Sequence, residues 1–261
     1  MMLPDRLRRL VVLALASSAF ALGAALSAPS IVAQEASWRE TAAQGEIPCN
    51  EQEPQEFLIR GNWQTTRRMT NEEVRERRAV HQRAVRYRTE TYGYFSGFGM
   101  AEWNRATPMQ SARGARLFGL PVRLHERILP AARCAEQEIA RSCRDEYQPR
   151  RLSGIRDRNT YHNGEVSNHV YGIAIDLDPT LNTCCNCVKE WRLHPLCQSR
   201  PRSIFDRMAM PECWVRSFEK YGFYWLGHDA LMDTMHFEFL GDPDHVLRSS
   251  GPPPHLQDAE P

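Results

Sequence analysis

The sequence predicts an α+β fold, with a small antiparallel sheet and flanking helices. Segments with helical periodicity come early in the chain, whereas short apolar segments typical of buried strands come late. The two kinds of segment do not alternate, which argues against a parallel sheet built from βαβ units. The chain has 261 residues, 42% of them hydrophobic and 25% charged, which suits one good-sized domain with extensions or two small ones.

Two segments have the pattern of helices. Thr70 and Glu73 have the spacing of a capping box, so we expect a helix over about residues 74–89, rich in Arg, Glu and Ala. Its arginines indicate either a solvated face with Glu–Arg pairs or a patch for an anionic polymer. From Val122 to about Cys143, apolar residues recur at helical spacing and indicate a helix that faces the core. These apolar residues are Leu124, Ile128, Leu129, Ala132 and Ile139.

The strand-like segments follow these helices. Residues 152–156 and 172–177 have the pattern of strands, and the second is short and apolar, as a buried strand should be. Asp178 and Pro179 end it. Two further segments, 218–226 and 236–240, complete the domain.

The first 33 residues have the pattern of a secretory signal peptide. Three Arg and one Asp precede an apolar run from Val11 to about Leu26, and small residues provide a cleavage site after Ala28 or Ala33. An uncleaved membrane anchor is the alternative, because about 16 apolar residues fall just short of a full span. No other stretch of the sequence is apolar enough to cross a bilayer. We therefore expect a periplasmic or extracellular protein without a membrane span once the signal is removed.

Three further parts follow the signal. Residues 34–115 are expected to form an N-terminal extension that carries the Arg-rich helix. Residues 116–248 are expected to form the chemically active domain, with a Cys-rich insertion at residues 180–213. Residues 249–261 contain three consecutive prolines and are expected to form a disordered tail.

The charge balance excludes a dedicated nucleic-acid-binding protein, which would show a clear basic excess. Lys and Arg number 33 against 32 Asp and Glu, for a net charge of +1. Removal of residues 1–33, which contain three Arg and one Asp, leaves a net charge of −1.

The chain has eight cysteines, an even number that predicts disulfides in an exported protein. Five of them lie in residues 180–213. A structural zinc site is the alternative there, but adjacent cysteines fit poorly to paired Cys-x-x-Cys ligands. Cys134 and Cys143 face different sides of a straight helix. We therefore expect them to pair with Cys49 or with the insertion rather than with each other.

Two short segments, 167–176 and 233–238, collect residue types that bind metals. Zinc in hydrolases has about three ligands of His and carboxylate type, with one position left for water. His169, Asp176 and His236 would supply that set. Asp176 lies in an otherwise apolar strand, where an ionised carboxylate is costly unless it is paired or bound to a metal. A hydrogen-bonded His–Asp pair without a metal is the alternative, and the spacing matches no generic zinc motif.

Further carboxylates lie close to these ligands in the sequence. Asp233 could stand beside a zinc-bound water as general base. Glu238 lies on the same strand face as His236, where it could orient that ligand or compete for the base role. The residues alone thus predict a metal site outside the cytoplasm, and no more.

Four sequence elements follow one another in the second half of the chain. Residues 153–156 read Ser-Gly-Ile-Arg, and residues 167–176 fit the pattern Ser-x-His-x-x-Gly-x-Ala-x-Asp. Residues 176–179 read Asp-Leu-Asp-Pro. The fourth element has two parts: residues 222–225 read Gly-Phe-Tyr-Trp, and residues 233–238 read Asp-Thr-Met-His-Phe-Glu. This order resembles the M15 zinc peptidases, a family of D-alanyl-D-alanine carboxypeptidases, D,D-dipeptidases and phage L-alanyl-D-glutamate endolysins.

The resemblance implies a role for each site residue. By it, His169, Asp176 and His236 are the ligands of a Zn²⁺ cofactor, Asp233 is the catalytic base, and Arg156 holds the substrate or stabilises the developing oxyanion. It also implies the zinc fold shared by D,D-peptidases and hedgehog-type proteins. Peptidoglycan stem peptides are the expected substrate, and the resemblance leaves the oligomeric state open.

Three activities fit this resemblance. D-alanyl-D-alanine carboxypeptidase is the expected one, and an L-Ala-D-Glu cell-wall endopeptidase is the first alternative. A non-catalytic zinc-containing binding module of the same fold is the rival from another class, although the three ligands and the base favour an enzyme. The chain departs from the family pattern at Ile155, where Tyr is usual, and at Leu226, where Gly is usual. Because of these departures and the insertion, the substrate preference does not transfer with the resemblance.

Overall fold

The computed structural model describes residues 38–42, 45–161, 165–187 and 189–248. The predicted signal peptide, residues 1–33, and the predicted disordered tail, residues 249–261, lie outside the described residues. Among the helices of the described part, none is long and apolar enough to cross a membrane.

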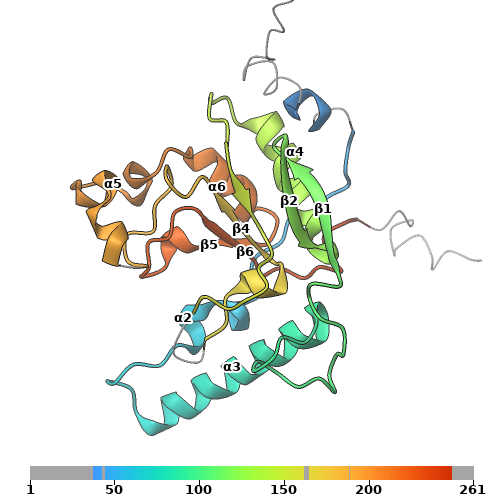
Figure 1. Cartoon of the computed structure of the whole chain (residues 1–261), viewed down its shortest axis with the longest axis vertical. Helices are drawn as coiled ribbons and strands as arrows, with labels where there is room; N and C mark the ends of the chain where they lie inside the picture. The colour runs from blue at the N-terminus through green and yellow to red at the C-terminus, as the bar shows by residue number, and fades with distance from the viewer. Residues whose placement is uncertain (1–37, 43–44, 162–164, 188, 249–261) are drawn as a thin grey trace, which may run out of the picture.

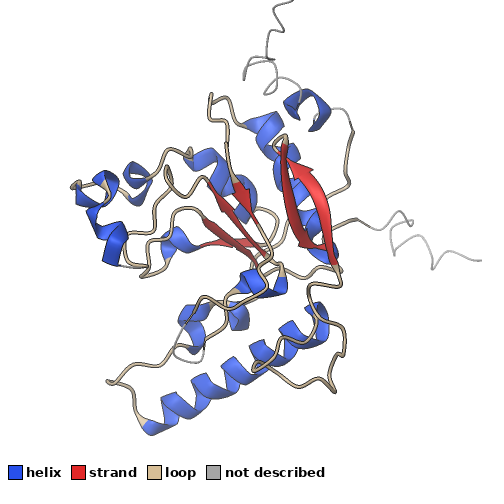
Figure 2. Ribbon diagram, in the orientation of Figure 1, coloured by secondary structure: helices blue, strands red, loops and turns tan. Residues whose placement is uncertain are grey.

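Two antiparallel sheets and the helices around them make up the fold (Figure 2). The larger sheet has the order β3-β4-β6-β5, and a separate hairpin is formed by β1 and β2. The strands are β1 (Ala112–Leu117), β2 (Leu120–His125), β3 (Leu152–Ser153), β4 (Ala174–Leu177), β5 (Phe223–Trp225) and β6 (His236–Phe239). This combination confirms the predicted α+β class, whereas the finer likeness to the hedgehog-type zinc fold stays a prediction.

The helices surround the four-stranded sheet (Figure 1). The α-helices are α2 (Arg60–Trp63), α3 (Asn71–Tyr92), α4 (Leu129–Ser142), α5 (Pro195–Gln198) and α6 (Glu212–Glu219). The 3-10 helices are η1 (Glu56–Leu58), η2 (Glu126–Ile128), η3 (Asn168–Tyr171), η4 (Lys189–Leu193), η5 (Ile204–Arg207) and η6 (Leu226–His228). In Figure 1 the β1–β2 hairpin and α4 lie to the right of the sheet, the insertion with α5 lies to the left, and α3 lies below.

The start of the predicted helix over residues 122–143 is wrong. Residues 120–125 form strand β2, and helix α4 begins only at Leu129. Phe118 and Gly119, which join β1 to β2, both have positive φ (51° and 77°), as the two central residues of a type I′ hairpin turn do. Val122 and Leu124 are buried on the inner face of β2, and their spacing of two residues fits a strand, whereas Leu124 and Ile128 are four residues apart, as on a helix.

The core lies between the four-stranded sheet and helices α4 and α6. Phe237 of β6 stacks on Phe218 of α6 with ring centroids 4.4 Å apart. Side chains alternate between the two faces of a strand, so His236 and Glu238 point away from Phe237. In the same way, Asp176 of β4 lies on the face opposite to that of its apolar neighbours. The aromatic core therefore fixes the two strands whose other face carries the predicted ligands.

The N-terminal part packs against the end of β6. Leu58, Ala84 and Leu240 form a small buried cluster between η1, α3 and the residue after β6. Helix α3 is longer than predicted but begins with the predicted capping box, in which Thr70 and Glu73 bond each other's backbone N–H groups.

The arginines of α3 differ in environment. Arg86 pairs with Glu90 at 2.8 Å, as expected for a solvated face. Arg88, in contrast, is buried and donates to the carbonyl of Leu58 at 3.2 Å. The predicted patch for an anionic polymer stays a prediction.

All eight cysteines are paired in four disulfides. The pairs are Cys49–Cys134, Cys143–Cys213, Cys184–Cys187 and Cys185–Cys197. This confirms the predicted disulfides. It also confirms that Cys134 and Cys143 pair with Cys49 and with the insertion rather than with each other. No thiolate is left for the alternative of a structural zinc site in the insertion.

His125, at the end of β2, is expected to make the protein sensitive to acid. Burial lowers its pKa to about 4, whereas the pKa of histidine in an unfolded chain is about 6.5. Between these two values the unfolded chain holds one proton more than the folded chain at this side chain. The contribution of His125 to the free energy of unfolding is therefore present above about pH 6.5 and is lost as the pH falls through about 4.

Urea unfolding at pH 7.0, 5.5 and 4.5 measures this effect as a difference between variants. His125→Asn keeps an acceptor for the backbone N–H of Arg127, which His125 Nδ1 accepts at 3.2 Å. This variant should lose less stability on acidification than the wild type. The exposed His245→Asn should behave like the wild type. The same pH dependence in all three proteins would contradict the assignment.

Candidate active site

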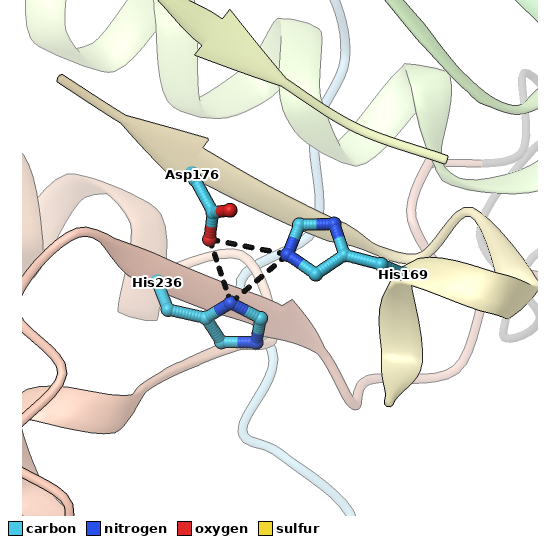
Figure 3. Close-up of side chains that lie close together, drawn as sticks. All are labelled: His169, Asp176 and His236. Carbon is cyan, nitrogen blue, oxygen red and sulfur yellow. Dashed lines mark hydrogen bonds and ion pairs between the residues drawn. The ribbon is translucent and has the colours of Figure 1, made fainter. Parts of the chain in front are cut away.

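Three buried side chains meet at one point of the sheet, and they are the three predicted ligands (Figure 3). Asp176 Oδ1 lies 3.1 Å from His169 Nε2 and 2.7 Å from His236 Nδ1. His169 Nε2 lies 3.2 Å from His236 Nδ1. Because these three atoms come from η3, β4 and β6, the site joins three separate parts of the chain.

The local structure explains how these side chains are brought together. Asp176 and His236 are direct partners in the antiparallel register of β4 and β6. Ser167 caps η3 by accepting the N–H of His169 at 3.4 Å. Gly172 ends η3 with φ 70°, and a Cβ at this position would lie 2.9 Å from the backbone nitrogen of His125. Glycine is thus required where the chain turns from η3 into β4.

Contacts on the far sides of the two imidazoles assign their tautomers. His169 Nδ1 lies 2.6 Å from the carbonyl of Gly154, which can only accept, so Nδ1 carries the proton. His236 Nε2 lies 3.1 Å from Glu238 Oε1, so this nitrogen donates to the carboxylate. In the neutral rings, His169 Nε2 and His236 Nδ1 are therefore bare lone pairs, and both face Asp176 Oδ1. Three electron pairs that face one another require a cation between them, either a proton or a metal ion.

Titration behaviour supports this requirement. Burial lowers the pKa of His169. Burial acts to raise the pKa of Asp176, but His169 and His236 outweigh it and hold that pKa well below its usual value. Burial acts to lower the pKa of His236, but the carboxylates of Asp176 and Glu238 raise it well above the ordinary value. Without a metal, the cluster thus holds a proton on His236. Two imidazoles and a carboxylate are also a common donor set of catalytic zinc, and the residues fit that ion.

Asp176 is also bound through its second oxygen. Ser153 Oγ donates to Oδ2 at 3.1 Å, and Arg156 Nη2 contacts the same oxygen. The backbone N–H of Arg156 donates to the carbonyl of His169 at 3.0 Å, which places this arginine beside the ligand cluster. Arg156 is half-buried and lines the cleft described below. It therefore orients Asp176 and is also open to a bound molecule.

Asp233 lies in the same cleft as the three ligands. It is 8% exposed, and burial raises the pKa of its carboxyl to about 7. Its Oδ1 is buried and has no hydrogen-bond partner in the described structure. Its Oδ2 lies 3.5 Å from Cys187 Sγ. A carboxyl with a pKa near 7 and a free oxygen is suited to move protons at neutral pH.

The cleft has a volume of about 520 Å³. Its lining includes residues that the sequence did not indicate: Arg60 of α2, Tyr161, Trp191, and the Cys184–Cys187 disulfide. Arg60 forms a 2.8 Å ion pair with Glu165 and lies 3.8 Å from Asp229. Both the N-terminal extension and the Cys-rich insertion thus contribute to the cleft. No local pattern marks these residues, because they reach the cleft only through tertiary contacts.

A second group of close metal-binding residue types consists of Cys184, Cys187 and Asp233. The two cysteines are joined to each other, and a disulfide does not offer the thiolates that bind zinc. The cluster of His169, Asp176 and His236 is therefore the better metal site of the two.

Trp225 of the fourth sequence element and the nearby His228 lie outside the cleft lining. Trp225 is fully buried in the core, and its Nε1 donates to the carbonyl of Thr234 at 2.9 Å. His228 is exposed, lies 2.8 Å from Glu219 and is not part of the cleft lining.

Comparison with known proteins addresses the same part of the chain. Residues 161–239 match the M15 peptidase family model described as D-alanyl-D-alanine carboxypeptidase. This segment belongs to the M15 peptidases. The matched M15 segment contains the three clustered residues and Asp233, whereas Arg156 and the whole N-terminal part precede it. Neither the search of curated proteins nor the search of solved structures gave a significant match.

Proposed function

We propose that this peptidase is exported, depends on zinc and cleaves peptidoglycan stem peptides as a D-alanyl-D-alanine carboxypeptidase. One observation carries the proposal. The ligand atoms of His169, Asp176 and His236 lie within 3.2 Å of one another, and Asp233, whose buried Oδ1 has no hydrogen-bond partner among the described residues, lines the same cleft. This is the donor set and the base that zinc-dependent hydrolysis of a peptide requires.

In the proposed mechanism each residue has a separate task. When bound, zinc supplies the Lewis acidity that makes water a nucleophile near neutral pH and polarises the scissile carbonyl. Asp233 accepts the proton of the attacking water on its carboxylate and passes it to the nitrogen of the leaving group. Arg156 places a permanent positive charge beside the cluster, where negative charge develops on the carbonyl oxygen. Glu238 keeps the proton of His236 on Nε2.

Export and substrate are supported by different features. The four disulfides suit an oxidising compartment, in agreement with the signal pattern of residues 1–33. The matched family model, described as D-alanyl-D-alanine carboxypeptidase, supports a stem peptide ending in D-Ala-D-Ala.

Mass spectrometry of purified muropeptides tests the proposal. The zinc-loaded protein should remove one D-alanine from a stem pentapeptide, and a chelator should stop the reaction until zinc is returned. Cleavage between L-Ala and D-Glu instead would establish the endopeptidase alternative. If zinc binds but no stem peptide is cut, the protein would be a non-catalytic zinc-containing binding module.

A further inference from the structure

Three arginines line the cleft, and they differ in their partners. Arg60 is held by Glu165 and Asp229, and Arg156 is held by Asp176. Within the described residues, Arg151 has no ion pair, and its side chain makes no hydrogen bond. One guanidinium in the lining of the cleft is thus free to bind a molecule that enters it.

The backbone fixes where Arg151 lies. Its N–H donates to Asp178 Oδ1 at 2.7 Å, and its carbonyl accepts the N–H of Asp178 at 3.0 Å. Strand β3 begins at the next residue, and Ser153 is the direct partner of Asp176. Side chains two residues apart share a strand face, so those of Arg151 and Ser153 point to the same side. Both line the cleft, and Ser153 Oγ donates to Asp176 Oδ2 at 3.1 Å.

This placement sets the distance from Arg151 to the ligand cluster. Two residues of a strand span about 6.6 Å, and an arginine side chain can cover much of that length. A carboxylate one or two peptide units from the scissile bond therefore lies within its reach.

The charges around Arg151 favour a carboxylate as the bound group. The carboxylates of Glu165 and Asp176 are already bound by other arginines. No hydrogen bond or ion pair joins Arg151 to Asp233, and the lining from the insertion, at the Cys184–Cys187 disulfide and Trp191, carries no charge. A guanidinium presents parallel N–H donors that match the two oxygens of a carboxylate.

We propose that Arg151 forms a subsite for a carboxylate of the peptide substrate. This inference rests on the proposed function and adds to it a substrate class and a specificity-determining residue outside the matched family segment. The carboxylate has two sources in a peptide, the C-terminus or an acidic residue within the chain. Arg151 binds either one next to the scissile bond, and the site thereby prefers anionic peptides over their neutral analogues.

Kinetics with matched peptides test the subsite. The substrates are a stem pentapeptide as free acid, the same peptide as C-terminal amide, and the free acid with its internal acidic residue replaced by the amide. Arg151→Gln should lower kcat/KM for the preferred anionic peptide by about 10- to 100-fold, the usual worth of a charge-assisted hydrogen bond, mainly through a higher KM. The same variant should cut the neutral analogue as fast as the wild type does.

Arg150→Gln is the matched control, because this adjacent exposed arginine lies outside the lining of the cleft. It should retain wild-type kinetics on every peptide. If Arg151→Gln and the wild type differ no longer on the C-terminal amide, Arg151 binds the C-terminal carboxylate. If they differ no longer on the peptide with the internal amide, Arg151 binds the acidic residue. Unchanged kinetics of Arg151→Gln, or an equal loss on anionic and neutral peptides, would overturn the subsite.

Calorimetric binding separates this inference from the proposed function. The three peptides are titrated into zinc-loaded Asp233→Asn protein and into the same protein with Arg151→Gln added. A drop of about 10-fold or more in affinity for the anionic peptide alone supports the subsite, even if the wild type hydrolyses nothing and the proposed enzyme function fails. Equal affinities in both proteins overturn the subsite, even if the wild type is an active peptidase.

Discussion

His236→Ala is expected to lose both zinc and peptidase activity. The change removes one of three converging electron pairs and leaves Asp176 without its 2.7 Å partner. Loss of an outer partner of a metal ligand typically costs 10- to 100-fold in affinity, so loss of the ligand itself should cost more than about 100-fold. Activity should fall by at least about 1,000-fold. Zinc content after dialysis against a weak chelator, followed by hydrolysis of a stem pentapeptide, measures both effects.

One control variant and one variant with an intermediate expected effect accompany this change. His228→Ala removes an exposed histidine that pairs with Glu219 and should leave zinc content and activity unchanged. Glu238→Gln keeps the shape of the side chain but weakens the acceptor of the His236 Nε2 proton, so it should bind zinc about 10- to 100-fold more weakly. Full zinc occupancy of His236→Ala would show that this histidine is not a ligand.

Asp233→Asn is expected to separate metal binding from catalysis. Asparagine keeps the size of the side chain, but it cannot accept a proton from water. General base catalysis contributes about 100- to 10,000-fold, so kcat should fall by that factor while zinc content stays at the wild-type level. Stopped-time assays of D-alanine release, with metal analysis of the same samples, provide the measurement. Asp157 is exposed and lies outside the cleft lining, so Asp157→Asn should have the zinc content and the kcat of the wild type.

Two results would contradict the role of Asp233. Undiminished activity of Asp233→Asn would show that another group is the general base. Glu238 would be the first candidate because it lies beside His236. Loss of zinc from the variant would make Asp233 a ligand rather than a base.

The ligand cluster could be predicted because its residues lie on short buried strands with clear local patterns. The segment before and through β4 carries His169 and Asp176, and β6 begins with His236. Each strand is apolar on its core face, so a buried His or Asp on the other face stands out in the sequence. Pairing of β4 with β6 then brings Asp176 opposite His236.

Other parts of the cleft could not be predicted, since their residues have no local signal. Arg60 comes from a four-residue helix in the N-terminal extension, and Trp191 comes from the irregular insertion. Each reaches the cleft through contacts between distant parts of the chain. The free Arg151 is indistinguishable from Arg150 in the sequence, and only the register of β3 shows which of them lines the cleft.

The error at β2 has a different physical cause. Leu124 and Ile128 are four residues apart and fit one face of a helix, whereas Val122 and Leu124 are two apart and fit a strand, so the segment carried both signals. In the folded protein the β1–β2 hairpin packs against α4, and this packing favours the strand over the helix. The signal that could have indicated the strand is Phe118-Gly119, a pair able to form the tight turn between β1 and β2.

X-ray absorption spectroscopy at the zinc edge identifies the atoms that bind the metal. If His169, Asp176 and His236 hold the metal, the first shell contains only nitrogen and oxygen at about 2.0–2.1 Å, with the outer scattering of two imidazoles. If instead Cys184 and Cys187 are reduced and bind zinc beside Asp233, a sulfur shell appears at about 2.3 Å. We expect the spectrum with two imidazoles and no sulfur, and a sulfur shell would contradict this ligand set.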